Sequence, residues 1–192
     1  MACYAFDADD TLVRDGSSHA LDGTPTASNP THVPDLDGQA LSFNGSGLVT
    51  VPMQAAFNVT SVTMEAWVYA TALPSTGRMG IMDKDGQYGM FIYAPGKTTC
   101  AGGNGPLTGP TLSLNTWIHL ACTYNGTTWT LYQDGKVAAS ATGTATALGT
   151  ASPGALVLGA NSPNGDGFQG RLDRMRIWNT ARTADQVCLE TP

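Results

Sequence analysis

Charged side chains are scarce in this sequence, and acidic ones outnumber basic ones. Only 12% of the 192 residues are Asp, Glu, Lys or Arg, and the formal net charge is -6 at pH 7. An acidic surface repels the phosphate backbone of nucleic acids, so we expect no nucleic-acid binding. No apolar run approaches the ~20 residues that a bilayer-spanning helix needs, so we expect no membrane span.

The amino terminus has no secretory signal. Met1-Ala2-Cys3 is followed by neither the basic segment nor the apolar segment of a signal peptide. The length suits one domain and is short for two, which predicts a single domain over residues 1–192. We expect this domain to be a piece of a longer protein.

The cysteines Cys3, Cys100, Cys122 and Cys188 form no CxxC pair, so they do not predict a zinc site. An even number at wide spacing favours two disulfides and an oxidising, extracellular compartment. Of the possible pairings we favour Cys3–Cys188, because the termini of a domain often lie close together, and this leaves Cys100–Cys122. The alternative is a set of reduced, buried thiols in a cytosolic protein.

Apolar and polar residues alternate along much of the chain. In Val62–Tyr69 the even-numbered residues are all apolar, and a period of two predicts a β-strand rather than a helix. Similar short segments predict strands at Leu41–Phe43, Leu48–Val51, Gly80–Met82, Tyr88–Tyr93, Trp117–Tyr124, Thr128–Gln133, Lys136–Ala141, Leu156–Gly159 and Arg171–Trp178.

Turn motifs join several of these segments. Asn125-Gly126 and Asp134-Gly135 predict tight hairpins, because the two central residues of a type I′ turn need positive φ. Asn44-Gly45-Ser46-Gly47 predicts a further hairpin. The capping-box spacing of Thr183 and Gln186 predicts one short helix over Thr183–Leu189. The expected fold is all-β, a two-sheet antiparallel β-sandwich with one short C-terminal helix.

Longer motifs follow one another in an order that is informative as a set. They are Tyr4-Ala5-Phe6-Asp7, Gly38-Gln39-Ala40-Leu41-Ser42-Phe43-Asn44-Gly45, Val62-Thr63-Met64-Glu65-Ala66-Trp67-Val68, Leu114-Asn115-Thr116-Trp117-Ile118-His119-Leu120, Leu131-Tyr132-Gln133-Asp134-Gly135 and Gly170-Arg171-Leu172-Asp173-Arg174-Met175-Arg176-Ile177-Trp178. Over nearly its whole length the sequence resembles the laminin G-like branch of the concanavalin A-like lectin/glucanase jelly rolls, with pentraxins as distant relatives. The resemblance implies two stacked sheets, frequent calcium sites and binding of glycans or proteins.

Catalytic carboxylates are few. Glycosidases need two carboxylates ~5–10 Å apart, and the glucanases that the sequence resembles group glutamates on one strand. Here the glutamates are Glu65 and Glu190, far apart in the chain, and no Gly-x-Ser-x-Gly nucleophile motif occurs. We therefore expect a protein that is not an enzyme. For Glu65 we expect an ion pair across the sheet with Arg174 or Arg176.

Asp173 is the first candidate for a metal ligand. It alternates in phase with Met175 and Ile177, which we expect to face the core, and a buried carboxylate is costly unless it is compensated. Calcium would compensate it, because calcium favours carboxylate and carbonyl oxygens. The alternatives are that Asp173 caps backbone N–H groups or pairs with Arg171.

The resemblance supplies the remaining calcium ligands. In similar proteins a structural calcium ties the N-terminal segment to the last strand. Carried over by motif, the partners of Asp173 are Asp15, in Asp15-Gly16-Ser17-Ser18, and Asn44, which follows Ser42-Phe43; Asp7 is a reserve ligand.

A second cluster of polar residues falls in predicted loops, at positions where pentraxin-like proteins have calcium-ligating residues. Polar and aromatic residues together can bind a sugar through its hydroxyls and its C–H face. The candidates for ligand binding are Asp83, Asp85, Tyr88, Asn161, Asn164, Asp166 and Phe168, with Tyr93 and Trp129 as further aromatic platforms. The alternative is ordinary turn chemistry, since Asp, Asn and Gly are turn formers. We expect Trp67, Trp117 and Trp178 to pack the sheets.

These features predict a non-catalytic, lectin-like module that binds a glycan or polysaccharide, is stabilised by calcium and belongs to a larger secreted protein. The alternative is an adhesion or structural module that contacts a cell-surface protein and has no glycan site. That alternative predicts an exposed apolar patch.

Overall fold

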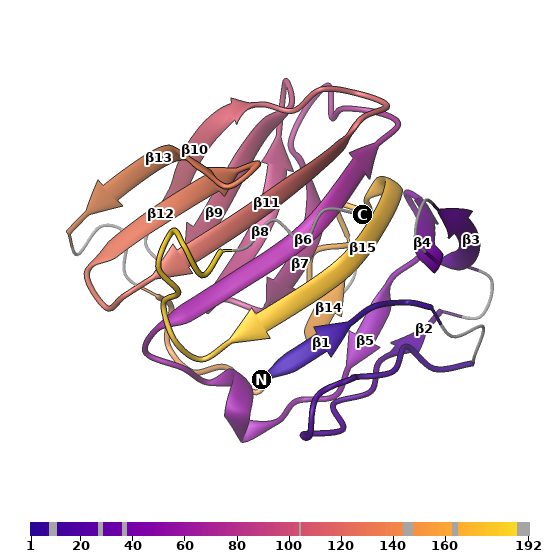
Figure 1. The fold of residues 1–192 in the computed structure, drawn as a ribbon, viewed down its shortest axis with the longest axis horizontal. Helices are drawn as coiled ribbons and strands as arrows, with labels where there is room; N and C mark the ends of the chain where they lie inside the picture. The colour runs from indigo at the N-terminus through magenta and orange to yellow at the C-terminus, as the bar shows by residue number, and fades with distance from the viewer. Residues whose placement is uncertain are drawn as a thin grey trace.

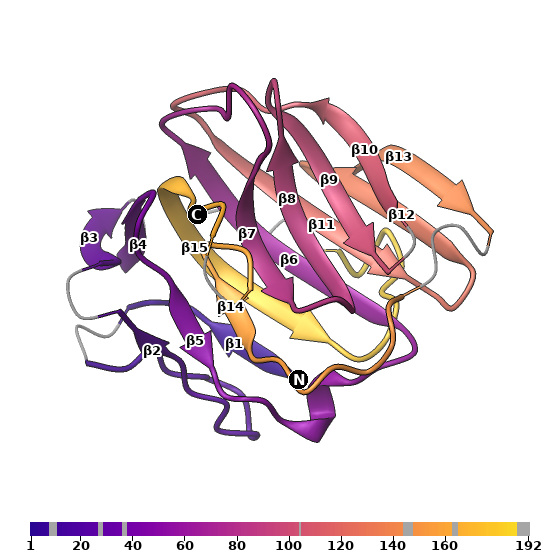
Figure 2. The same ribbon diagram turned by 180° about the vertical axis from the view of Figure 1, so that it is seen from behind.

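The computed structural model describes residues 1–7, 11–26, 29–35, 38–103, 105–143, 148–162 and 165–187. The described residues form two stacked antiparallel sheets, which we call the front sheet and the back sheet (Figures 1 and 2). In spatial order, the front sheet contains β13 (Lys136–Thr142), β12 (Thr128–Gln133), β11 (Trp117–Tyr124), β6 (Val62–Ala70), β15 (Gln169–Trp178), β4 (Gly38–Asn44) and β3 (Thr31–Asp35), with β1 (Ala2–Tyr4) also paired to β15. The back sheet contains β10 (Gly105–Thr111), β9 (Lys97–Gly102), β8 (Tyr88–Tyr93), β7 (Arg78–Lys84), β14 (Leu156–Leu158), β5 (Val49–Val51) and β2 (Thr24–Pro25). The predicted all-β sandwich is confirmed.

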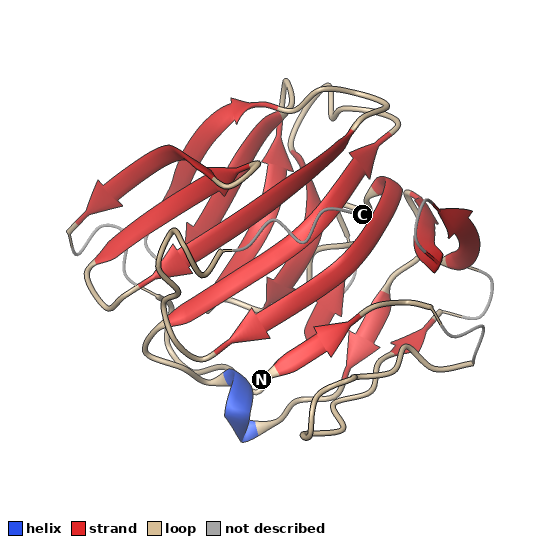
Figure 3. Cartoon of the chain, in the orientation of Figure 1, coloured by secondary structure: helices blue, strands red, loops and turns tan. Residues whose placement is uncertain are grey.

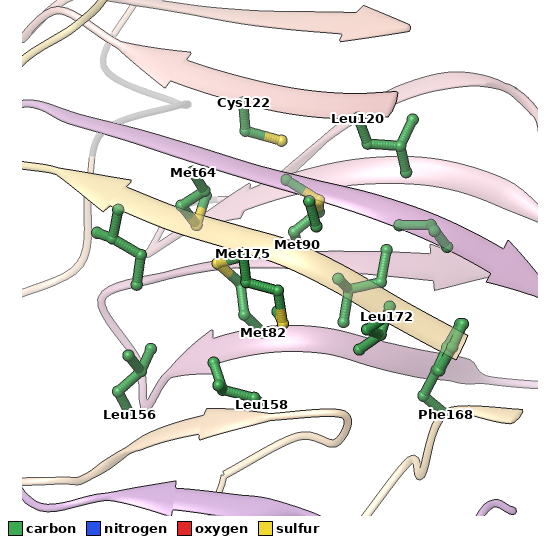
Figure 4. Close-up of a cluster of buried hydrophobic side chains, with 14 of the residues drawn as sticks. Met64, Met82, Met90, Leu120, Cys122, Leu156, Leu158, Phe168, Leu172 and Met175 are labelled. Carbon is green, nitrogen blue, oxygen red and sulfur yellow. The ribbon is translucent and has the colours of Figure 1, made fainter. Parts of the chain in front are cut away.

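The core lies between the sheets, where the two-residue alternation places one set of side chains from each strand. Met64 and Met175 from the front sheet meet Met82 and Met90 from the back sheet (Figure 4). Methionine is flexible and fills irregular gaps of this kind. The apolar even-numbered residues of β6 all face this core, as predicted.

The Cys100–Cys122 disulfide joins the back sheet to the front sheet, from β9 to β11, with its Cα atoms 5.7 Å apart. This predicted pair is confirmed. Cys188 lies outside the described residues, so the Cys3–Cys188 pair stays a prediction.

Of the predicted turns, Asp134-Gly135 is a two-residue hairpin between Gln133 and Lys136, with φ of 49° and 71°. The hairpin predicted at Asn44-Gly45-Ser46-Gly47 is wrong. The strands on either side of it, β4 and β5, belong to different sheets, so this segment crosses the sandwich. Local turn residues cannot reveal which sheet the next strand joins.

The predicted C-terminal helix is not formed in its described part. Residues 183–187 make a single turn, in which Gln186 Oε1 accepts a hydrogen bond from the Thr183 amide; residues 188–189 lie outside the described part. The chain is held extended just before it, because Thr63 Oγ1 donates to the Thr180 carbonyl and accepts from the Arg182 amide. Within the described ranges the one helical element is the 3-10 turn Ala55–Phe57, seen in Figure 3, and no helix has the length and apolarity to cross a membrane.

Candidate functional site

A hollow of about 310 Å³ lies on the outer face of the back sheet, and we call it the back-sheet hollow. It is lined by residues 78, 83, 85–89, 91, 101–103 and 161–162, from β7, β8, β9 and the loop after β14. Asp83, Gly89 and Ala101 are cross-strand neighbours there, on the face opposite the core. A Cβ atom at Gly89 would lie 2.5 Å from the Phe91 ring and 2.9 Å from Asp83. The glycine at position 89 therefore lets the Phe91 ring and the Asp83 carboxyl lie close over the strand.

Asp83 is the most buried charge of the hollow, with 6% of its surface exposed. Burial raises the pKa of its carboxyl to about 6. A hydrogen bond of 2.8 Å, which Oδ2 accepts from the Ser162 amide, acts in the opposite direction and lowers the pKa. The negative charge of the neighbouring Asp85 also raises the pKa of Asp83. At neutral pH Asp83 is therefore mainly an ionised acceptor of hydrogen bonds, and it takes up a proton in mildly acidic solution.

Arg78 holds the other side of the hollow. Its guanidinium lies 4.3 Å from the centroid of the Phe91 ring, a cation–π contact. Its Nε donates to Asp166 Oδ2 at 2.8 Å, and its Nη1 donates to the Tyr93 hydroxyl at 3.0 Å. Three partners thus fix a planar cation with an aromatic ring beneath it.

The structure brings together several residues that the sequence predicted as ligand-binding. Asp83, Asp85 and Asn161 line the hollow. Asp166 lies beside it and reaches it through its ion pair with Arg78. Asn164 lies outside the described residues.

The predicted aromatic platforms are not where the sequence placed them. Phe168 has no exposed surface and packs edge-on against Phe43 in the core (Figure 4). Trp129 is likewise in the core. Tyr88 borders the hollow, but its side chain is 2% exposed and donates its hydroxyl to the Phe57 carbonyl. Phe168 and Trp129 are not available as platforms, because their loop and strand turn these rings inward. Tyr88 lines the hollow, with its ring buried.

Arg78 and Phe91 were missed by the sequence reasoning. Phe91 sits between Met90 and Ile92, and it faces outward because β8 alternates. The signal that could have found it is the cross-strand row of small residues around it, with Gly89 on one strand and Ala101 on the next.

Asp173 does not face the core as predicted. A β-bulge lies between Asp173 and Arg176, with Arg174 at φ +46°, and the extra residue reverses the alternation. Asp173 is therefore the cross-strand neighbour of Trp67 on the outer face of the front sheet. Burial raises the pKa of Asp173 to about 7. The Arg174 amide donates a hydrogen bond to Asp173 Oδ1, which lowers the pKa in part.

The other predicted calcium ligands are engaged by protein groups. Asp15 Oδ1 accepts from the amides of Cys3 and Ser17, and Oδ2 accepts from the Ser17 hydroxyl and the Leu21 amide. Asn44 Oδ1 accepts from the amide and the hydroxyl of Ser46. These bonds occupy the oxygens that calcium would need, so this set does not fit a shared ion as it stands. Among the described residues, no three of Asp, Glu, His and Cys come together to hold a metal. Calcium binding stays a prediction.

Glu65 lies on the outer face of the front sheet, away from the back-sheet hollow. Its cross-strand neighbour is Arg176, one of the two arginines that the sequence offered, but the ion pair shown is with Arg182, whose Nη1 lies 3.3 Å from Glu65 Oε1. Its Oε2 lies 3.7 Å from Nε2 of His119. Glu65 is 1% exposed, so it acts as part of a buried charge cluster.

Comparison with known proteins decides the family. A model of the concanavalin A-like lectin/glucanases superfamily, Laminin_G_3, matches residues 43–188. The chain belongs to this superfamily. No curated protein matches the sequence.

Solved structures share the superfamily fold at low identity. Domain 4 of AbnA, a GH43 extracellular arabinanase from Geobacillus stearothermophilus, in complex with arabinotriose, has a TM-score of 0.78 at 22% identity, over 97% of this chain and 95% of that one. The Trypanosoma rangeli sialidase with the inhibitor DANA has a TM-score of 0.72 at 15% identity, over 97% and 31%. The binding domain of botulinum neurotoxin serotype G has a TM-score of 0.74 at 12% identity, over 97% and 49%. This chain thus spans about a third of the sialidase and half of the toxin binding domain.

Proposed function

We propose that this domain is a non-catalytic carbohydrate-binding module and that it binds glycan in the back-sheet hollow. The observation that carries the proposal is the convergence of Asp83, Asn161 and the Arg78–Phe91 stack over a row of small residues. Such a site offers hydrogen bonds to sugar hydroxyls from fixed groups, in a hollow of about 310 Å³. The complex of the arabinanase domain with arabinotriose supports the ligand class.

The position of Glu65 supports a non-catalytic role. A glycosidase of the expected kind would place its glutamates in the sugar site, but Glu65 lies on the opposite sheet and is paired with Arg182. Release of reducing ends from a polysaccharide panel would overturn this part of the proposal.

The proposal includes a place in a larger secreted protein. The Cys100–Cys122 disulfide supports an oxidising compartment, because cytosolic thiols are kept reduced. The arabinanase domain, which is one part of an extracellular enzyme, is similar in length and fold. In the described part of the chain, the exposed large hydrophobic side chains are Leu114 and Val137, which offers little apolar surface to a protein partner.

A glycan array, run with calcium and with chelator, tests the proposal. We expect binding to a restricted set of neutral glycans, and an array without hits under both conditions would contradict it. The same samples test calcium, because an ion that binds the folded state raises the melting temperature by mass action. Equal melting temperatures in calcium and in chelator would contradict calcium binding.

A further inference from the structure

A second hollow lies beside the first. It measures about 290 Å³ and is lined by residues 45–48, 160 and 165–167, and we call it the loop hollow. One wall is the segment that crosses from β4 to β5, and the other is formed by Ala160 and residues 165–167, between β14 and β15. Both hollows lie at the small end of the ~300–1,000 Å³ range of ligand pockets, so each suits a small unit rather than a folded chain.

The two hollows share a wall. Ala160 lines the loop hollow, and the next residues, Asn161 and Ser162, line the back-sheet hollow. Asp166 lines the loop hollow and binds Arg78, which lines the other. The Arg78 and Asp166 side chains are 27% and 37% exposed, so this ion pair is accessible from solvent.

Backbone hydrogen bonds fix the shared wall. The Gly80 amide of β7 donates to the Asp166 carbonyl at 2.7 Å, and the Asn161 amide donates to the Gly165 carbonyl at 2.8 Å. A wall held in this way keeps a constant separation between the two hollows, which preorganises them for a ligand that enters both.

The two hollows differ in chemistry. The back-sheet hollow presents the planar guanidinium of Arg78, which covers the buried Phe91 ring, whereas the residues that line the loop hollow include neither a guanidinium nor an aromatic ring. The loop hollow offers glycine backbone together with Ser46 and Asp166. It therefore suits hydrogen bonding to hydroxyls, without a stacking surface.

Charge restricts the ligand further. Asp83, Asp85 and Asp166 face one guanidinium, that of Arg78, on a chain whose net charge is -6. Lys84 is buried beneath them and interacts with Asp83 and Asp85, so it offsets part of this charge, but the carboxylates still outnumber the cations. A uronic or sialic acid would meet like charge, whereas a neutral sugar would find many acceptors for its hydroxyls.

We infer that the two hollows are successive subsites for a neutral, linear oligosaccharide, with the Arg78–Asp166 pair between the two bound units. This inference rests on the proposed function and extends it from glycan binding to recognition of a chain rather than a single sugar.

The substitution Gly165→Trp tests the inference. Gly165 lines the loop hollow, and a Cβ atom added there meets no other atom within 4 Å, so this position accepts a large side chain at the hollow. The control is Thr108→Trp, an exposed position on β10 of the same sheet that lines neither hollow. Calorimetric titrations use the monosaccharides and hexasaccharides of arabinan, xylan and cellulose, with oligogalacturonates as the anionic arm.

We expect the wild type to bind the hexasaccharide of its preferred backbone about tenfold more tightly than the monosaccharide, which fills one hollow only. Gly165→Trp should remove most of that gain, and Thr108→Trp should keep it. Equal affinity for both lengths, an unchanged gain in Gly165→Trp, or preference for the oligogalacturonates would overturn the inference and leave the proposed function intact. If the wild type binds no member of the panel, the proposed function fails and the inference fails with it.

Discussion

The outer face of the front sheet is covered, whereas the outer face of the back sheet is hollow. Val187 packs on Ala121 and Tyr132 of the front sheet, and Arg182 reaches Glu65 on the same face. On the back sheet, the hollow lies beside the row through Gly89 and Ala101, which has no large side chain of its own. Both faces come from strands with the same alternation. Side-chain size and a covering segment, rather than the strand pattern, decide which face can receive a ligand.

Filling the hollow should give the largest change in binding. Ala101→Trp places a large ring at a position that lines the back-sheet hollow, and it should weaken glycan binding by at least ~30-fold, as expected when a central contact region is blocked. Thr108→Trp adds the same ring to the same sheet outside the hollow and should bind as the wild type does. Calorimetry measures both, and equal affinity of the two variants would remove the back-sheet hollow as the site.

Removing the ion-pair partner of a buried carboxylate on the front sheet should give the largest change in stability. Arg182→Ala leaves Glu65 buried without its guanidinium, which should cost about 2 kcal/mol of unfolding free energy. The control is Arg14→Ala, because Arg14 pairs with Asp22 at an exposed position, where an ion pair contributes only ~0–1 kcal/mol. Urea denaturation compares the variants. Glycan affinity should stay at the wild-type value in both, and a loss in Arg182→Ala would mean that the front face takes part in binding.

A smaller change in stability should appear when the buried carboxylates are replaced by neutral amides. Asp83 has its pKa raised to about 6, so the folded state keeps a proton that the unfolded state has already released. Stability therefore falls as pH rises through the interval between the ordinary carboxyl pKa and about 6. Asp83→Asn should be more stable than the wild type by ~1–2 kcal/mol at pH 7.5, and the gain should shrink at pH 4.

Asp173→Asn is the matched variant on the front face, where burial also raises the pKa. It should show a similar pH-dependent gain in thermal melts but no change in glycan affinity. Asp83→Asn should weaken binding, because its amide replaces an ionised acceptor. If both variants bind equally well, Asp83 has no role in the site.

The local features of the fold could be predicted from the sequence. The alternation in Val62–Tyr69 and the Asp134-Gly135 turn depend on neighbouring residues only, and both predictions are confirmed. Asp83, Asp85 and Asn161 were found because polar turn residues mark the ends of strands, and the structure gathers them in one hollow.

The missed features depend on contacts that are distant in sequence. A single bulge at Arg174 turned Asp173 from the core to the outer face, and no local pattern marks it. Phe168 follows a glycine-rich loop, but the crossing segment brings it against Phe43 in the core. Arg78 and Phe91 form their stack only after β7 and β8 pair.

The most direct test of glycan binding in the back-sheet hollow is amide chemical-shift mapping of the ¹⁵N-labelled domain during titration with its strongest array hit. The largest shifts should fall in residues 83–91, 101–103 and 161–162, with little change along β6. The largest shifts at Trp67, Tyr69 and Trp117, on the outer face of the front sheet, would contradict the account.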